Sequence, residues 1–195
     1  MIYSEIKVTS VEEIQARLGK FKSQTPLVLS RAINRAIQNV KKNMGKETSQ
    51  LYYISSSEVK KSVRITKASK GSLKAAAISS GAGIELIKYK VSPKTPVRYR
   101  GASRSPRVYK AGVKKAGGMK PLDGDPKSFV AVMKSGHVGV FTRKNGKSLP
   151  IKQLYGPSVP QIVKNEDIMS KINKEASETL QKRIDAEINN ILRKG

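Results

Sequence analysis

The strongest pattern along the chain is a helical repeat of apolar residues in its first quarter. The dipeptide Thr25-Pro26 suits the start of a helix, because proline is tolerated in the first turn. Apolar residues then recur three or four positions apart. They are Leu29, Ile33, Ala36, Ile37, Val40 and Met44. This spacing predicts a long amphipathic helix with one buried face.

Three other helices are indicated by their caps or by their repeat. The order Ser-x-x-Glu, in which two side chains satisfy free backbone N–H groups at a helix start, occurs at residues 10–13 and 55–58. We expect a short helix after each. Over residues 165–194 an apolar residue recurs every four positions behind Asn165, a good helix cap. This pattern predicts a long C-terminal helix.

Between the helices the apolar runs shorten to lengths that are typical of strands. Residues 64–83 indicate two short strands of a hairpin, bounded by glycines, and residues 84–91 alternate as a further strand. Residues 128–154 predict a meander with a turn at Gly136 and a tight Asn-Gly turn at residues 145–146.

These elements predict an α+β fold in a single domain. A small antiparallel sheet would pack with the long N-terminal helix and the long C-terminal helix, and an extended basic arm or loop would leave it. The core should be modest, because only 37% of the residues are hydrophobic and 5% are aromatic. Within residues 1–195 we expect a helical part at 1–63, the sheet at 64–91 and 128–154, the basic arm at 92–127 and the C-terminal helix at 165–194.

Charge changes the picture, because 39 Lys and Arg face only 14 Asp and Glu, a net charge of +25. This exceeds what solubility requires and suggests a polyanion as a neighbour. Packing between copies of the chain, or an acidic protein partner, would account for the charge equally well. Composition alone leaves these explanations open.

The cations are densest between residues 86 and 122, where eleven Lys and Arg occur without one acidic residue. Prolines and glycines interrupt any helix there, which is why we expect an arm that contacts DNA or clasps a neighbouring subunit. Tyr99 and Tyr109 are interleaved with the cations, as stacking residues or as sheet and subunit contacts. The candidate contacts to DNA or an acidic partner are Arg98, Arg100, Arg104, Arg107, Lys110, Lys114 and Lys115.

Reactive groups are sparse. The chain has no cysteine, and His137 is its only histidine, which we assign to a turn or strand rather than to catalysis. A magnesium nuclease would have to use Asp123, Asp125 and Glu85, of which only the first two are near in sequence. Asp123 and Asp125 belong to the sequence DGDP, which is typical of a turn. We therefore expect no enzymatic activity, no metal and no cofactor.

A membrane role is also not expected. The first ten residues, MIYSEIKVTS, include an acid and lack an apolar run of signal-peptide length. Nowhere do 18 consecutive apolar residues occur.

Two segments are similar to a known family. The segment SRAINRAI, residues 30–37, resembles a helix containing Ala-x-Asn-Arg, and FVAVMKSGHVGVFTR followed by LPIKQLYGPSVPQI resembles a strand, turn, strand and Pro-rich exit in the same order. Both features are those of the phage minor tail protein Z family, which includes tail completion proteins of long-tailed phages and prophages. The basic insertion and the closing helix fit this resemblance as well.

The resemblance implies a structural virion protein that completes the head-proximal end of a tail. It implies a ring, of six subunits, that meets tail terminator, tail tube and head connector proteins, aids head–tail joining and positions the DNA end. It further implies a location in the tail or neck of the virion, with the host cytoplasm as the site of assembly. The subunit or tail interface would include His137, Val138, Phe141, Leu154, Tyr155 and Pro157.

A second hypothesis needs no virion. A basic nucleic-acid-binding protein outside a phage would show the same charge and the same absence of reactive groups. It predicts steeply salt-dependent binding by the isolated monomer, with a loss on the order of 10⁵-fold in affinity between 50 and 200 mM salt if about ten phosphates are neutralised.

Overall fold

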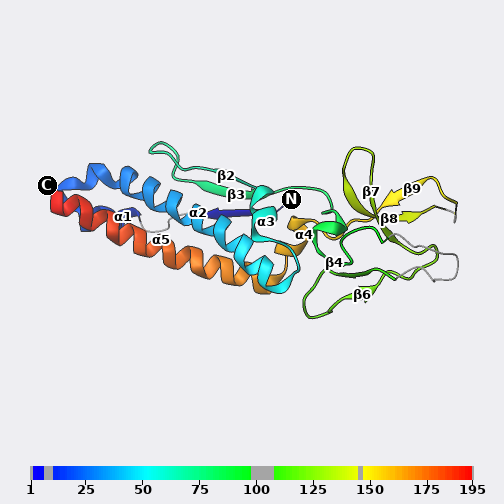
Figure 1. Ribbon diagram of the computed structural model, residues 1–195. Coiled ribbons are helices and arrows are strands. Elements are labelled where there is room, and N and C mark those ends of the chain that lie inside the picture. The colour runs from blue at the N-terminus through cyan, green and yellow to red at the C-terminus, as the bar shows by residue number, and fades with distance from the viewer. Residues whose placement is uncertain (1, 7–10, 98–107, 145–146, 195) are drawn as a thin grey trace. The chain divides into compact units, whose positions relative to one another are not determined.

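A computed structural model describes residues 2–6, 11–97, 108–144 and 147–194 of the chain (Figure 1). The chain divides into two compact units. We call Met1–Glu47, Ser56–Gly81 and Pro160–Gly195 the helical unit, and Thr48–Ser55 and Ala82–Val159 the β unit. The predicted α+β class is confirmed, while the organisation as a single domain stays a prediction.

The helices fall at the predicted places. The short first helix and the helix after the second capping box are confirmed, as are both long helices. A 3-10 helix at residues 19–24 joins the short first helix to the long helix after it, and a short α-helix at residues 159–163 precedes the C-terminal helix in the chain. The helices are α1 (Val11–Leu18), η1 (Gly19–Gln24), α2 (Thr25–Leu51), α3 (Ser56–Lys61), α4 (Val159–Val163) and α5 (Glu166–Lys194).

The α2 stripe forms the centre of the helical unit. All six apolar residues that predicted the helix, from Leu29 to Met44, have no exposed surface. From α5 the matching stripe buries Ile168, Ile172, Ala176, Ile184 and Ile188. Removing apolar surface from water is the dominant gain in folding, so this paired burial stabilises the unit.

Helices α2 and α5 lie side by side and antiparallel (Figure 1). Polar pairs along their length fix this direction. Arg31 Nη1 lies 3.3 Å from Glu187 Oε2, Asn39 Nδ2 donates to Thr179 Oγ1 at 2.9 Å, and Lys171 Nζ lies 3.9 Å from Glu47 Oε2. The sequence numbers fall along one helix as they rise along the other, and these pairs extend from residues 31 and 187 to residues 47 and 171.

The predicted cap of α5 is confirmed. The Oδ1 atom of Asn165 accepts hydrogen bonds from the backbone N–H groups of Asp167, at 3.1 Å, and Ile168, at 3.3 Å. Such a cap satisfies donors that the first turn of a helix leaves free. The first residue of the earlier predicted capping box, Ser10, lies outside the described residues.

One antiparallel sheet completes the helical unit. The predicted hairpin is confirmed as β2 (Val63–Thr66) and β3 (Ala75–Ser79). A strand that the sequence did not suggest, β1 (Ile2–Ile6), pairs with the other edge of β3, giving the order β1-β3-β2. Asn34 of α2 holds the loop after β2, because its amide donates to the Ala68 carbonyl at 2.9 Å and accepts from the Ala68 N–H at 2.8 Å.

The β unit contains two further sheets among its described residues. The strands of the predicted meander are confirmed as β7 (Phe129–Val132), β8 (Val138–Arg143) and β9 (Ile151–Gln153), while the predicted Asn-Gly turn at residues 145–146 lies outside the described residues. The second sheet has the order β4-β5-β6, with β4 at Lys90–Ser92, β5 at Lys110–Gly112 and β6 at Lys120–Pro121. The strands therefore belong to three sheets and not to one sheet drawn from residues 64–91 and 128–154.

Two segments differ from the prediction. The strand expected over residues 84–91 is wrong in its first part, where Leu86–Lys88 form a 3-10 turn, η2. This turn buries Leu86 and Tyr89, three positions apart, on the same side, which an extended strand would not do. Residues 108–122, within the predicted arm, carry β5 and β6, and Tyr109 is buried there.

The close approach of α2 and α3 depends on a glycine. A Cβ atom on Gly45 would lie 2.4 Å from Ser56 Oγ and 3.0 Å from the Ser56 carbonyl oxygen. In an open helix, Gly to Ala stabilises by about 1 kcal/mol. At this contact we expect Gly45→Ala to lower the free energy of unfolding by about 1–3 kcal/mol, as overpacking does.

Urea unfolding followed by circular dichroism would measure this change. Gly71→Ala is the matched control, because a Cβ atom there would have no heavy atom within 4 Å. A Gly45→Ala protein as stable as the control would show that α3 does not pack against α2 at this point.

Candidate anion-binding site

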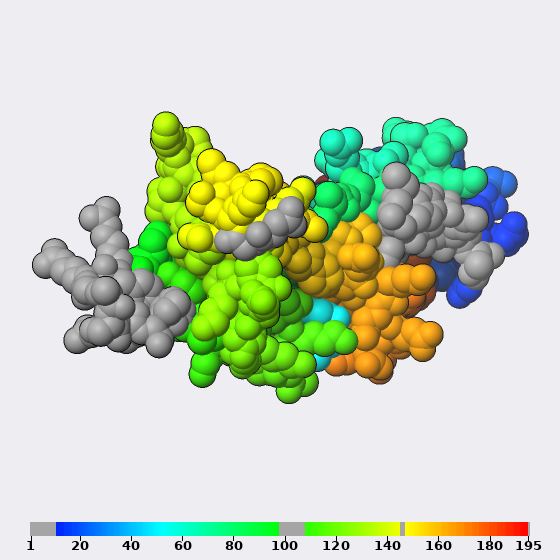
Figure 2. Space-filling model, turned by 90° about the vertical axis from the view of Figure 1, so that its right-hand side faces the viewer, coloured from blue at the N-terminus to red at the C-terminus, as the bar shows by residue number. Residues whose placement is uncertain are grey.

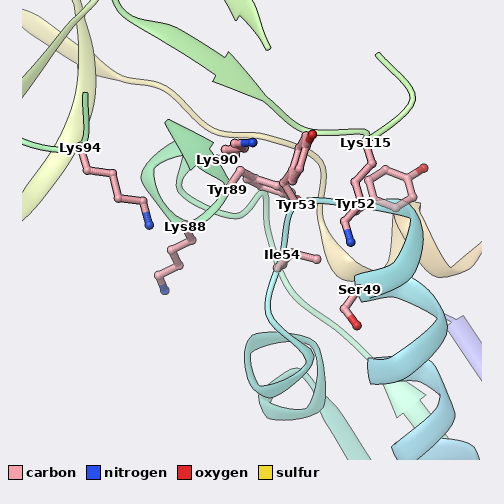
Figure 3. A pocket seen from close by; sticks show the side chains of 9 residues that line it. All are labelled: Ser49, Tyr52, Tyr53, Ile54, Lys88, Tyr89, Lys90, Lys94 and Lys115. Atoms are coloured by element: carbon pink, nitrogen blue, oxygen red, sulfur yellow. The ribbon is translucent and has the colours of Figure 1, made fainter. Parts of the chain in front are cut away.

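A basin of about 280 Å³ opens on the surface of the β unit (Figure 3). Its cations and rings come from three segments that are distant in sequence, around residues 49–54, 88–94 and 115. Four lysines and three tyrosines dominate the lining, which we call the lysine basin. Its residues are Ser49, Tyr52, Tyr53, Ile54, Lys88, Tyr89, Lys90, Lys94 and Lys115.

Backbone hydrogen bonds hold the first of these segments against the third. The Tyr53 N–H donates to the Val113 carbonyl at 2.8 Å, and the Lys115 N–H donates to the Leu51 carbonyl at 2.9 Å. This pairing fixes the start of the Lys115 side chain beside the tyrosines. A lysine on such a frame needs less ordering than one on a free loop before it can bind a ligand.

Aromatic rings support two of the cations near the basin. The Lys90 Nζ atom lies 4.8 Å from the centre of the Tyr53 ring, and the Lys114 Nζ atom lies 5.9 Å from that of Tyr52. These are cation–π distances, at which the negative face of the ring attracts the ammonium. Gly112 lies against the Tyr53 ring, since a Cβ atom there would be 3.1 Å from two ring carbons.

Tyr89 forms the floor of the basin and is only 1% exposed. Its hydroxyl donates to the Pro157 carbonyl at 2.7 Å. Gly156 makes room for the ring, because a Cβ atom at that position would lie 2.6 Å from Tyr89 Cε2. Burial raises the pKa of the Tyr89 phenol, with a smaller contribution from Tyr52, so this group stays neutral and keeps its donated hydrogen bond.

The charge around the basin is largely uncompensated. The sequence of the β unit holds 17 Lys and Arg against 3 Asp and Glu, a net charge of +14. Of these acids, Glu85 lies 3.9 Å from Lys88 and 3.7 Å from His137. Within the part of the chain that the structure describes, no carboxylate lies within 4 Å of the ammonium groups of Lys90, Lys94 or Lys115. The basin is therefore suited to an anion.

Only some of the residues predicted to contact DNA or an acidic partner are among those that the structure describes. Arg98, Arg100, Arg104 and Arg107, with Tyr99, lie outside the described residues. Lys110 and Lys114 are exposed, and Lys115 lines the basin. Tyr109 is not a stacking surface, because it is 5% exposed and its hydroxyl oxygen accepts a hydrogen bond from the Val97 N–H.

Sequence reasoning did not select the other lining residues. Lys88, Lys90 and Lys94 belong to the acid-free run, which was the available signal. Tyr52 and Tyr53 lie about 60 positions before Lys115 in the sequence, and no local sequence pattern predicts that these two segments pair.

The predicted interface residues surround β8 and the segment after β9. Phe141 is buried, 6.3 Å from Phe129 between ring centres, and Val138 and Leu154 are half-buried. His137 Nε2 lies 3.1 Å from Gln153 Nε2. Tyr155 is 56% exposed, whereas Pro157 accepts the Tyr89 hydrogen bond. Of this set, Tyr155 offers the most exposed apolar surface.

Groups that would suggest other chemistry are not gathered in the described residues. Asp123 and Asp125 are exposed, and Glu85 is engaged with Lys88 and His137. Residues 11–97, 108–144 and 147–194 contain no group of three potential metal ligands. Across the same ranges, every helix is too short or too polar to cross a bilayer.

Comparison with known proteins gives one match. A family model described as prophage minor tail protein Z (GPZ) matches residues 9–194. No curated protein and no solved structure matches the chain. The matched range includes residues of both units.

The Tyr89 hydrogen bond gives a test of the basin floor. We expect Tyr89→Phe to lower the free energy of unfolding by about 1 kcal/mol at pH 7, because the Pro157 carbonyl loses its donor. The advantage of the wild type should shrink as pH rises above the ordinary tyrosine value of 10.0, since the unfolded chain ionises there before the buried phenol does. Urea unfolding at pH 7 and pH 10.5 measures both effects. An advantage that is unchanged at the higher pH would contradict the burial argument.

Proposed function

Because this chain belongs to the prophage minor tail protein Z family, we propose that it completes the head-proximal end of a long-tailed phage tail as a ring. Membership makes it a phage minor tail protein, a structural component of the virion tail. The ring, its six subunits and its part in head–tail joining are our proposal. The observation that carries it is the family match over residues 9–194.

The partners follow from that location. We propose that the ring contacts tail tube and tail terminator proteins on one side and head connector proteins on the other. It would assemble in the host cytoplasm and remain in the neck of the virion, without enzymatic activity. The net charge of +25 supports a position where DNA passes, since phage DNA in the channel is a polyanion.

Exposed apolar side chains of the β unit support contacts between subunits. Val132, Leu149 and Tyr155 are 52%, 70% and 56% exposed. Residues 147–152, yellow in Figure 2, lie on the surface of the molecule. A ring would bury such residues between neighbours, as interfaces of oligomers do. We assign Tyr155 to this interface, together with His137 and Val138.

We expect light scattering to detect a ring, either of the purified protein alone or after addition of purified tail tubes. Tyr155→Ala should reduce the fraction of protein in the oligomeric ring, or its affinity for tails, at least tenfold. The variant loses the exposed phenol group, while the Cβ atom and the backbone stay. Leu192→Ala is the control, since Leu192 is 46% exposed in the helical unit.

A protein that stays monomeric and does not bind tail tubes at any protein concentration, yet binds DNA, would overturn the proposal. That result would favour a basic nucleic-acid-binding protein outside a virion. Equal effects of Tyr155→Ala and Leu192→Ala would remove Tyr155 from the interface.

A further inference from the structure

We propose that the lysine basin binds the phosphodiester backbone of nucleic acid by charge alone, without reading bases. The proposal rests on the proposed function in one respect, that a tail-neck protein meets DNA. It names a site and a ligand chemistry of its own. Lys88, Lys90, Lys94 and Lys115, from two segments distant in sequence, line a cavity of about 280 Å³ there (Figure 3).

Lysine chemistry points to phosphate. An ammonium is a compact point charge that binds phosphate oxygens without the fixed geometry of a guanidinium. Among the described residues, Lys90, Lys94 and Lys115 have no carboxylate partner to displace. An incoming anion therefore gains attraction without first breaking an ion pair at these three groups.

The tyrosines of the basin are engaged in ways that exclude base stacking. Tyr89 is 1% exposed and Tyr52 is 7% exposed, so neither presents an open face. The Tyr53 ring has Lys90 over it at 4.8 Å and Gly112 in contact. Proteins that stack bases need exposed rings. Here the rings support cations, so the site recognises charge and not sequence.

A nucleic-acid strand fits this surface better than an acidic protein does. Lysine is depleted from protein–protein interfaces, where aromatic residues and arginine are enriched. Protein surfaces that meet each other also mix both signs to fix their register. Residues 86–122 carry one sign only, which matches the uniform charge of a phosphate backbone.

The test compares two triple variants of the full chain with the same loss of charge. The basin variant is Lys90→Gln with Lys94→Gln and Lys115→Gln. The control is Lys67→Gln with Lys70→Gln and Lys74→Gln, three exposed lysines around the β2–β3 hairpin. Glutamine keeps part of each stem, and circular dichroism with thermal unfolding checks that both variants fold.

Fluorescence anisotropy with labelled 20-mers, one duplex and one single strand, each in an AT-rich and a GC-rich sequence, measures affinity between 50 and 200 mM salt. We expect the basin variant to flatten the log–log salt slope by about 2.7 on duplex and about 2 on single strand, one phosphate for each lysine. The control should change it by less than half as much. Affinities for the two sequences should agree within about threefold, since the charge term is independent of sequence.

Three outcomes would overturn the proposal: equal slopes for the basin variant and the control, a strong preference between the two sequences, or tighter binding of a poly-glutamate 20-mer than of either nucleic acid. The last would assign the basin to an acidic protein partner. Tail binding of the same variants separates this proposal from the proposed function. If the wild-type protein binds tails but its DNA binding does not depend on the basin, only the lysine-basin proposal is overturned. If DNA binding depends on the basin but the protein does not bind tails, only the tail proposal is overturned.

Discussion

With 39 Lys and Arg but only 14 Asp and Glu, the chain has too few carboxylates to neutralise its cations. A net charge of +25 repels itself and opposes any compact state. Of the 14 acidic residues, 11 belong to the helical unit. On α5 they pair with cations of α1 and α2: Asp185 with Arg17 at 2.8 Å, Glu187 with Arg31 at 3.3 Å and Glu175 with Lys46 at 3.6 Å. Glu175 and then Glu47 raise the pKa of Lys46. Exposed pairs of this kind each contribute little, so the buried stripes of α2 and α5 supply the stability and the ion pairs select the antiparallel direction.

The β unit also has an excess of cations, and here aromatic rings rather than carboxylates lie beside two of its lysines. Its sequence has only three acids, and aromatic rings take the place of carboxylates beside Lys90 and Lys114. A ring attracts an ammonium without cancelling its charge. The lysines are therefore ordered and remain fully positive toward solvent. An arrangement with carboxylates would have been equally ordered but neutral, and could not have attracted an anion.

The sequence predicted those elements whose signal is local. The α2 stripe repeats over about four turns, and every residue of it is buried. Asn165 caps α5 as its position next to the repeat indicated. Pairings between distant segments could not be predicted. Strand β1 joins β3, about 70 positions later, and residues 51–53 join residues 113–115. The paired segments are short, and no tight turn in the sequence links either segment to its partner. The lysine basin depends on the second of these pairings, which is why a count of cations suggested a binding surface without locating one.

The residues that resemble the family have structural tasks. In the helix motif, Ala32 is fully buried and Asn34 holds Ala68 through two hydrogen bonds, so both maintain the helical unit. In the Pro-rich exit, Gly156 makes room for Tyr89, and the Pro157 carbonyl accepts a hydrogen bond from the Tyr89 hydroxyl. The basin lies outside both segments, except that its floor rests on the exit through Tyr89. The family match over residues 9–194 identifies a phage minor tail protein. The ligand chemistry of this chain depends on other positions, whose charge can change without disturbing Asn34 or Gly156, because exposed lysines contribute little to packing.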